Sequence, residues 1–188
     1  MEHAAMATGG KGEIVFMVGP MGSGKSTVGR HLSELLGYGF IDSDAEIEAR
    51  AGADIPWIFD VEGEAGFRRR ESAVLADLAT QQHIVIATGG GAILAEHNRQ
   101  VIADTGVVVF LNVSVAQQLK RTGSGEGRPL LQTGDREVTL KQLMAEREPL
   151  YSALADVTIS ASGANARKVA RHIETQLRQQ GLLSSGTE

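Results

Sequence analysis

The sequence contains no cysteine, and aromatic residues make up only 4% of its 188 residues. Without cysteine the chain can form neither disulfides nor thiolate metal sites, so the fold needs no oxidising compartment and we expect a cytoplasmic protein. Proline is also scarce, at four residues, and no proline-rich linker divides the chain. The apolar runs are too short to span a bilayer, so we expect no membrane partner.

Positive charge is in the minority, with 18 basic against 23 acidic residues and a net charge of -5. The overall electrostatic field of the protein therefore does not favour binding to nucleic acid or to an anionic membrane. An anionic ligand must be bound by a local basic cluster. With 42% hydrophobic residues, the chain can build one full-sized core. We predict a single domain over residues 13–181, between tails at residues 1–12 and 182–188.

The order of hydrophobic patterns predicts strands that alternate with helices. Short apolar runs indicate five strands, at residues 14–18, 40–42, 84–87, 107–111 and 157–159. Helical periodicity indicates helices at residues 25–36, 45–51, 62–81, 95–103, 115–122, 137–154 and 165–180. This alternation predicts a three-layer α/β/α fold with a parallel sheet, in which ligands bind beyond the carboxyl ends of the strands.

A phosphate-binding loop follows the first strand. Residues 19–26, GPMGSGKS, match the G-x-x-x-x-G-K-[ST] pattern between a predicted strand and a predicted helix. The backbone N–H groups of such a loop and the positive end of the helix bind phosphates, and the motif assigns Lys25 to the β and γ phosphates. The alternative is an ordinary glycine-rich turn. The predicted ATP-binding residues here are Gly22, Ser23, Gly24, Lys25, Ser26 and Thr27.

Two further strand ends carry polar or glycine-rich sequence. Asp42 and Asp44 flank Ser43 after the second strand, where one carboxylate can assist a metal and the other can meet a hydroxyl group. Alternatively, both aspartates only cap the next helix. Residues 89–91 are three glycines after the third strand, and they allow close approach of a ligand to the backbone unless they form a plain flexible turn.

The motifs VGPMGSGKST, DSD, GEAGFRRRE, ATGGGA, RPLL and REPLY occur in this order from about residue 14 to the last helix. In content and order they resemble the shikimate kinase family. The resemblance implies a P-loop kinase of the nucleoside monophosphate kinase-like fold, with a five-stranded parallel sheet in the order 2-3-1-4-5. It also implies transfer of the γ-phosphoryl group of MgATP to the 3-hydroxyl of shikimate, a step toward chorismate and the aromatic amino acids.

The resemblance also implies roles for individual residues. It makes Lys25, Asp44 and Arg128 catalytic, with Asp44 on the ring hydroxyls as the candidate base. It assigns one Mg²⁺ ion, bound with ATP as co-substrate, to Ser26 and to Asp42 through water. The substrate region spans about residues 43–72, and the implied substrate-binding residues are Asp44, Arg68, Gly89, Gly90, Gly91 and Arg147.

The chemistry of these arginines agrees independently with an acidic substrate. A planar guanidinium forms two parallel hydrogen bonds with a carboxylate, so Arg68 and Arg147 suit an anion in a net acidic protein. Glu71 follows Arg68 by three residues on one predicted helix face and can lock its rotamer. Phe59, Phe67 and Trp57 can either form the wall of the pocket or belong to the core.

A glycine-rich segment at residues 122–136 has little apolar content, so we predict a mobile lid that excludes water from the γ-phosphate. In the RPLL motif Arg128 is predicted to contact the transferring phosphoryl group, unless it is only a solvated loop charge. The resemblance places Arg121 near adenine. The loop at residues 160–167 is predicted to hold adenine, with Asn165 either in direct contact or serving as a helix N-cap.

The sequence therefore predicts an ATP-dependent kinase, a monomer that binds ATP and shikimate. Two alternatives remain at this level. One is a kinase for another sugar acid, such as gluconate. The other is a nucleotide-dependent switch without an acceptor, which would not need an arginine pair such as Arg68 and Arg147.

Overall fold

A computed structural model describes residues 11–123, 131, 134–163 and 165–183 of the chain. All strands of the described part form one parallel sheet in the order β2-β3-β1-β4-β5. These strands are β1 (Ile14–Val18), β2 (Gly39–Asp42), β3 (Ile84–Ala87), β4 (Val107–Asn112) and β5 (Val157–Ser160). The predicted fold class and strand order are confirmed.

The central strands are apolar on both faces. Every side chain of β1 is at most 3% exposed, and β3 and most of β4 are equally buried. Runs of valine and isoleucine without alternation are typical of strands in a parallel sheet that is covered on both sides. This is why the sequence showed these strands as continuous apolar runs.

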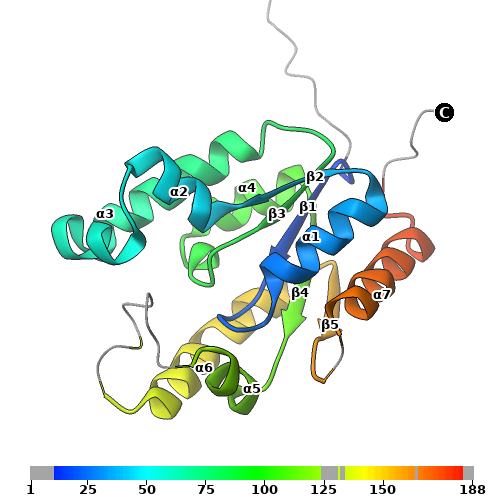
Figure 1. Ribbon diagram of the computed structural model, residues 1–188. Helices are drawn as coiled ribbons and strands as arrows, with labels where there is room; N and C mark the ends of the chain where they lie inside the picture. Colours follow the sequence, from blue (N-terminus) through cyan, green and yellow to red (C-terminus); the bar gives the residue numbers. More distant parts are fainter. Residues whose placement is uncertain (1–10, 124–130, 132–133, 164, 184–188) are drawn as a thin grey trace, which may run out of the picture.

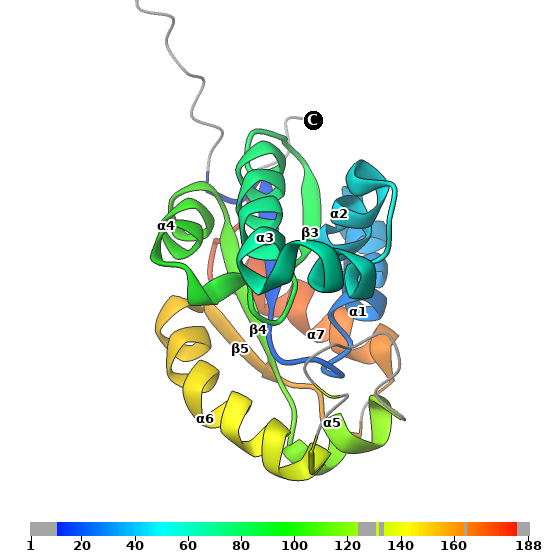
Figure 2. The same ribbon diagram turned by 90° about the vertical axis from the view of Figure 1, so that its left-hand side faces the viewer.

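Helices cover the two faces of the sheet (Figures 1 and 2). One face packs against α1 (Lys25–Leu36) and α7 (Ala166–Gln179), and Leu182 and Leu183 also pack there, so the packed chain extends past residue 181. The opposite face carries the longer helices α3 (Ile55–Leu78) and α6 (Arg136–Leu154), with the shorter α4 (Glu96–Thr105) and the 3-10 helix η1 (Ala92–Leu94). Two more helices extend the second layer, α2 (Ser43–Ala51) beside α3 and α5 (Val115–Arg121) beside α6.

The largest departure from the predicted elements is at α3. The pattern predicted a helix from residue 62, but α3 begins at Ile55. Asp54 caps this helix, because its side chain accepts a hydrogen bond from the N–H of Trp57. Gly63 breaks the helical geometry with φ 70° and ψ 177°, so two helical segments meet at this residue. The break shifts the apolar periodicity, which explains why the first segment was not predicted.

The carboxyl ends of β1, β2 and β3 lie side by side in the sheet. Ala87 pairs with both Met17 and Asp42, so the loops after β1, β2 and β3 leave the sheet side by side. The phosphate loop, the two aspartates and the three glycines therefore meet there. Among the described helices, none is long and apolar enough to cross a membrane.

Candidate active site

The phosphate loop after β1 depends on glycine at its entry. Gly19 has φ +146°, and a Cβ atom there would lie 2.5 Å from the carbonyl oxygen of Leu111 on β4. Gly22 and Gly24 also have positive φ values, of 75° and 91°. L-amino acids with a side chain rarely adopt these angles, so the sequence of the loop dictates its curled backbone.

Lys25 begins α1 and folds back across this loop. Its Nζ donates to the carbonyl oxygens of Gly19 at 2.8 Å and Pro20 at 2.9 Å. The ammonium group is therefore held at the mouth of the loop, beside the positive end of α1. This arrangement attracts an anion such as a phosphate group.

Asp42 has two roles at the end of β2. Its Oδ1 caps α2 by accepting the N–H groups of Asp44 and Ala45, at 3.0 and 3.3 Å. Its Oδ2 accepts the hydroxyl of Ser26 from α1. The capping alternative therefore holds for Asp42 but leaves its second oxygen at the mouth of the phosphate loop.

Ser26 and Asp42 together offer a hydroxyl and a carboxylate beside the phosphate loop. Mg²⁺ prefers hard oxygen ligands, and it commonly takes only one or two from the protein while phosphates and water supply the others. Within the described residues, no group of three or more histidine and carboxylate side chains could hold a metal by itself. The pair thus fits a magnesium ion that arrives with a nucleotide.

Asp44 lies in the first turn of α2 and points toward the glycine loop. A Cβ atom on Gly89 would lie 2.7 Å from Asp44 Oδ1, and this oxygen is buried without a hydrogen-bond partner in the described chain. Burial, together with the charges of Asp42 and Glu71, raises the pKa of Asp44 to about 6, although the charges of Lys25 and Arg68 lower it. Near neutral pH Asp44 is a carboxylate whose Oδ1 lacks a donor among the described residues, so this oxygen is suited to accept a hydrogen bond from a ligand hydroxyl.

We expect Asp44→Asn to stabilise the ligand-free and metal-free protein. The rise in pKa from 3.8 to about 6 means that the charged form is disfavoured by folding. The stabilisation relative to the unaltered protein should be absent below about pH 4, grow as the pH rises to about 6, and reach at most about 3 kcal/mol above it. Urea unfolding of both proteins at about pH 5 and pH 7.5 measures it. If the substitution changed the free energy of unfolding equally at both pH values, the charge of Asp44 would not destabilise the folded protein.

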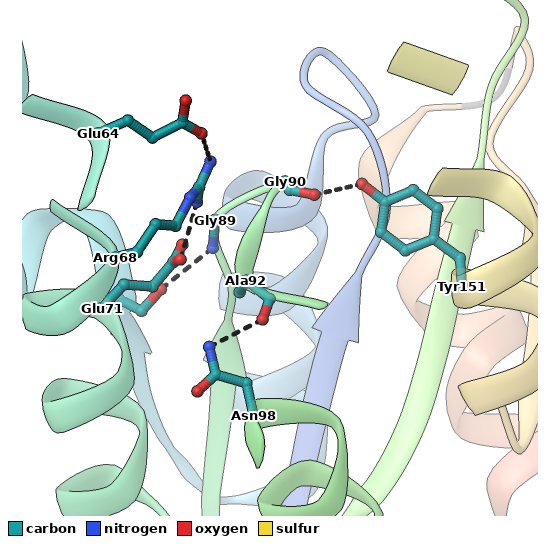
Figure 3. Close-up of polar contacts among 9 residues, drawn as sticks. Glu64, Arg68, Glu71, Gly89, Gly90, Ala92, Asn98 and Tyr151 are labelled. Atoms are coloured by element: carbon teal, nitrogen blue, oxygen red, sulfur yellow. Dashed lines mark hydrogen bonds and ion pairs between the residues drawn. The ribbon is translucent and has the colours of Figure 1, made fainter. Parts of the chain in front are cut away.

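Arg68 lies on α3 between two glutamates (Figure 3). Its Nη1 donates to Glu71 Oε2 at 2.8 Å, and its Nη2 donates to Glu64 Oε1 at 3.1 Å. The predicted contact between Arg68 and Glu71 is thus confirmed. Glu71 is 1% exposed, and burial raises its pKa while Arg68 lowers it. A Cβ atom on Gly91 would lie 2.7 Å from Arg68 Cζ, so glycine leaves room for the guanidinium group.

Arg147 approaches the same space from α6. The residue is only 5% exposed, and its Nε is buried without a hydrogen-bond partner among the described residues. A Cβ atom on Gly90 would be 3.7 Å from its Nη1. A buried guanidinium that lacks part of its hydrogen bonding is suited to bind an anion.

One cavity of about 540 Å³ contains these groups. It joins the phosphate loop, both aspartates, the three glycines and both arginines. Phe59 and Phe67 form its aromatic wall, with their ring centroids 4.9 Å apart, whereas Trp57 is 52% exposed and does not line it. The predicted site residues that line the cavity are Gly22, Gly24, Lys25, Ser26, Thr27, Asp42, Asp44, Arg68, Gly89, Gly90, Gly91, Arg121 and Arg147.

Of the other predicted nucleotide contacts, Arg121 lines this cavity, whereas Asn165 does not. Arg121 donates from Nη1 to Gly22 O at 3.1 Å and from Nη2 to Ala161 O at 3.3 Å, so it bridges the phosphate loop and the loop after β5. Asn165 caps α7 by accepting the N–H of Arg167 at 2.9 Å, which agrees with the capping alternative. Arg128 and most of the predicted lid at residues 122–136 lie outside the described residues.

Sequence reasoning missed three side chains that touch the loop after β3. Ser43 Oγ accepts the N–H of Gly89 at 3.1 Å, and Tyr151 donates its hydroxyl to Gly90 O at 2.5 Å. Asn98 donates to the carbonyl of Ala92 at 2.9 Å. Tyr151 follows Arg147 by four residues in one helix, and this spacing was the available signal.

Comparison with known proteins identifies close relatives. A sequence model of the family described as shikimate kinase matches residues 21–178. A shikimate kinase of Halorhodospira halophila is 55% identical over 166 residues, which are 88% of this chain and 94% of the relative. One of Vibrio cholerae is 50% identical over 165 residues, 88% of this chain and 95% of the relative. A solved shikimate kinase of Acinetobacter baumannii, in complex with shikimate, has a TM-score of 0.88 and 47% identity, covering 90% of this chain and 94% of that one.

Proposed function

Because the chain belongs to the shikimate kinase family, we propose that its cavity transfers the γ-phosphoryl group of MgATP to the 3-hydroxyl of shikimate. The products are ADP and shikimate 3-phosphate, on the route to chorismate and the aromatic amino acids. The observation that carries the proposal is the shared cavity, in which a phosphate loop faces a buried carboxylate and two arginines. This combination provides for a phosphoryl donor and an acidic, hydroxylated acceptor together.

The phosphate end of ATP binds to the loop at residues 19–26. Backbone N–H groups from this loop and the positive end of α1 receive the phosphates, and Lys25 turns from the carbonyls of Gly19 and Pro20 toward the β and γ phosphates. Arg121 and the loop at residues 160–167 border the adenine. Asn165 supports that loop as the cap of α7.

Ser26, through its hydroxyl, and Asp42, through water, would hold one magnesium ion. When bound with ATP, the ion neutralises charge that develops on the phosphate oxygens. The existing contact between Ser26 and Asp42 supports this assignment, because it brings both oxygen groups to the mouth of the phosphate loop.

Shikimate lies between the phosphate loop and α3. Its carboxylate pairs with Arg68 and Arg147, whose guanidinium groups are confined by Glu71, by burial and by the glycine loop. Gly89, Gly90 and Gly91 all line the cavity, but the amide of Gly89 already donates to Ser43, so we assign the contact with shikimate to the amides of Gly90 and Gly91. Asp44 Oδ1 accepts the hydrogen bond of the reacting hydroxyl.

The chain's own residues then act mainly by positioning the two substrates and by stabilising charge. Asp44 orients the 3-hydroxyl toward the γ-phosphorus and takes up its proton as the new O–P bond forms, while the bond between the γ-phosphorus and the bridging oxygen breaks and ADP leaves with that oxygen. Lys25 balances the negative charge of the transferring group, because its ammonium group lies beside the loop that binds the phosphates. We propose that Arg128 supplies a second positive charge to the transferring phosphoryl group. This assignment rests on the RPLL motif alone.

We also propose that the enzyme is a cytoplasmic monomer. The described residues of one chain bring the phosphate loop, Asp44 and both arginines into one cavity, which supports a site built within a single subunit. The absence of cysteine makes the fold independent of an oxidising compartment.

A coupled assay for ADP release tests this function and its rivals. With MgATP, the protein should turn over in the presence of shikimate and at least about 100-fold more slowly with gluconate, which lacks the ring that the cavity encloses. EDTA should abolish the turnover, and added Mg²⁺ should restore it. Equal ADP release with and without either acid would support a nucleotide switch and refute the proposed kinase.

A further inference from the structure

The loop after β3 is held by side chains from three different helices, and Figure 3 labels two of these side chains, Asn98 and Tyr151. Ser43 of α2 accepts the N–H of Gly89, Tyr151 of α6 donates to the carbonyl of Gly90, and Asn98 of α4 donates to the carbonyl of Ala92. The three side chains are 0%, 0% and 2% exposed, respectively. None of them lines the cavity of about 540 Å³.

Tyr151 connects this loop to the helix that carries Arg147. Its ring stacks on Phe110 of β4, with centroids 5.0 Å apart and planes at 25°, so the phenol has a fixed position. Its hydroxyl then fixes Gly90, where an added Cβ atom would lie 3.7 Å from Arg147 Nη1. One helix therefore sets both the arginine and the neighbouring loop backbone.

The downstream part of the loop is fixed in the same way by α4. Asn98 bonds the first carbonyl of η1, and Nη1 of Arg99 bonds the next two, those of Ile93 and Leu94, at 2.8 Å each. Side-chain donors from α4 therefore bond all three carbonyls of the turn that follows the glycines.

Glycine makes such anchoring necessary. A Cβ atom at Gly89 would displace the carboxylate of Asp44, and one at Gly91 would displace the guanidinium of Arg68, so glycine at these two positions leaves both groups in place. Three successive glycines, however, have wide conformational freedom, and backbone amides bind a ligand well only if they are held in place beforehand.

We propose that Ser43, Asn98 and Tyr151 are positioning residues for the acceptor, which act through the backbone of Gly89 to Ala92 without touching the ligand. The inference rests on the proposed function, because it assumes that shikimate lies against the amides of Gly90 and Gly91. Loss of an anchor should weaken shikimate binding and leave ATP binding and the chemical step nearly unchanged.

The chain offers a matched pair of tyrosines for the test. Both of its tyrosines donate their hydroxyl to a glycine carbonyl, Tyr151 to Gly90 in the cavity wall and Tyr38 to Gly12 at 3.0 Å. Tyr151→Phe should raise the KM for shikimate about five- to tenfold, the usual loss for one buried neutral hydrogen bond, with kcat and the KM for ATP within about twofold. Tyr38→Phe should leave all three constants within about twofold.

A pair of serines provides a second test at the other end of the loop. Ser43→Ala leaves the amide of Gly89 unpaired and should raise the KM for shikimate about tenfold. Its control is Ser33→Ala, because Ser33 is also buried and donates to a backbone carbonyl, that of Arg30 at 2.8 Å, away from the cavity. Calorimetric titration of shikimate should give the same changes in Kd.

The outcomes separate the inference from the function on which it rests. If the unaltered protein does not turn over shikimate, the proposed function fails. If it does, but Tyr151→Phe and Ser43→Ala leave the KM for shikimate unchanged or lower only kcat, the three residues are not positioning residues. An equal rise in KM with Tyr38→Phe would also overturn the inference, because it would reflect a general loss of stability.

Discussion

Asp44→Asn is expected to lower kcat for shikimate by about 10²- to 10⁴-fold, the range for loss of a positioned acid or base. The amide has nearly the shape of the carboxylate, but it cannot take up the proton of the acceptor hydroxyl. It also presents an N–H donor in place of one of the two carboxylate oxygens. The Kd for ATP should stay within about threefold, since the phosphates bind to the loop at residues 19–26. Steady-state kinetics and calorimetric titration of ATP measure the two effects.

Asp54→Asn is the matched control for this substitution. Asp54 caps α3 by accepting the N–H of Trp57 at 2.9 Å, and asparagine caps helices as well as aspartate does. The control should therefore keep both kcat and stability. If Asp44→Asn retained full kcat, Asp44 would have no catalytic role, and hydroxyl orientation would have to come from elsewhere in the cavity.

The same substitution should stabilise the ligand-free protein. The measurements of kcat and of the free energy of unfolding are therefore informative together. Asp44 faces Asp42 and Glu71 in a partly buried position, so its charge costs folding free energy. A residue that weakens the fold and is required for turnover is retained for its chemistry. Reduced activity with reduced stability would instead indicate a structural role for Asp44.

Local patterns predicted the phosphate loop and the strands of this fold. The motif at residues 19–26 is contiguous, and the backbone angles of its glycines follow from their lack of a side chain. The strands of the sheet interior are continuous apolar runs because both faces are covered. Glu71 was predicted to contact Arg68 because the two residues lie three apart in one helix.

Contacts between distant segments could not be predicted in this way. The bond from Tyr151 to Gly90 spans 61 residues, and the bond from Gly89 to Ser43 spans 46. No periodicity encodes such pairs, since they depend on how α2 and α6 pack around the end of β3. The break at Gly63 was missed for a different reason, because a single residue in a non-helical conformation divides two helical segments that share no common apolar face.

Arg147→Met is expected to raise the KM for shikimate about 10- to 100-fold, the equivalent of one or two hydrogen bonds between charged groups. Methionine keeps much of the length of the side chain in a position that is 5% exposed, so the core should remain filled. Because Arg147 pairs with the carboxylate and not with the reacting hydroxyl, kcat should fall by no more than about threefold. Initial-rate kinetics with saturating MgATP give both constants.

The methyl ester of shikimate shows whether Arg147 recognises charge. The ester keeps the ring and its hydroxyls but has no carboxylate, so its KM should change by no more than about threefold between the unaltered protein and Arg147→Met. Arg70→Met controls for the loss of one positive charge, because Arg70 pairs with Glu62 outside the cavity and should leave both KM values unchanged. If Arg147→Met raised the KM for shikimate and for its methyl ester equally, Arg147 would shape the pocket without binding the carboxylate. A change confined to the KM for ATP would place Arg147 at the nucleotide and contradict the proposed orientation of the two substrates.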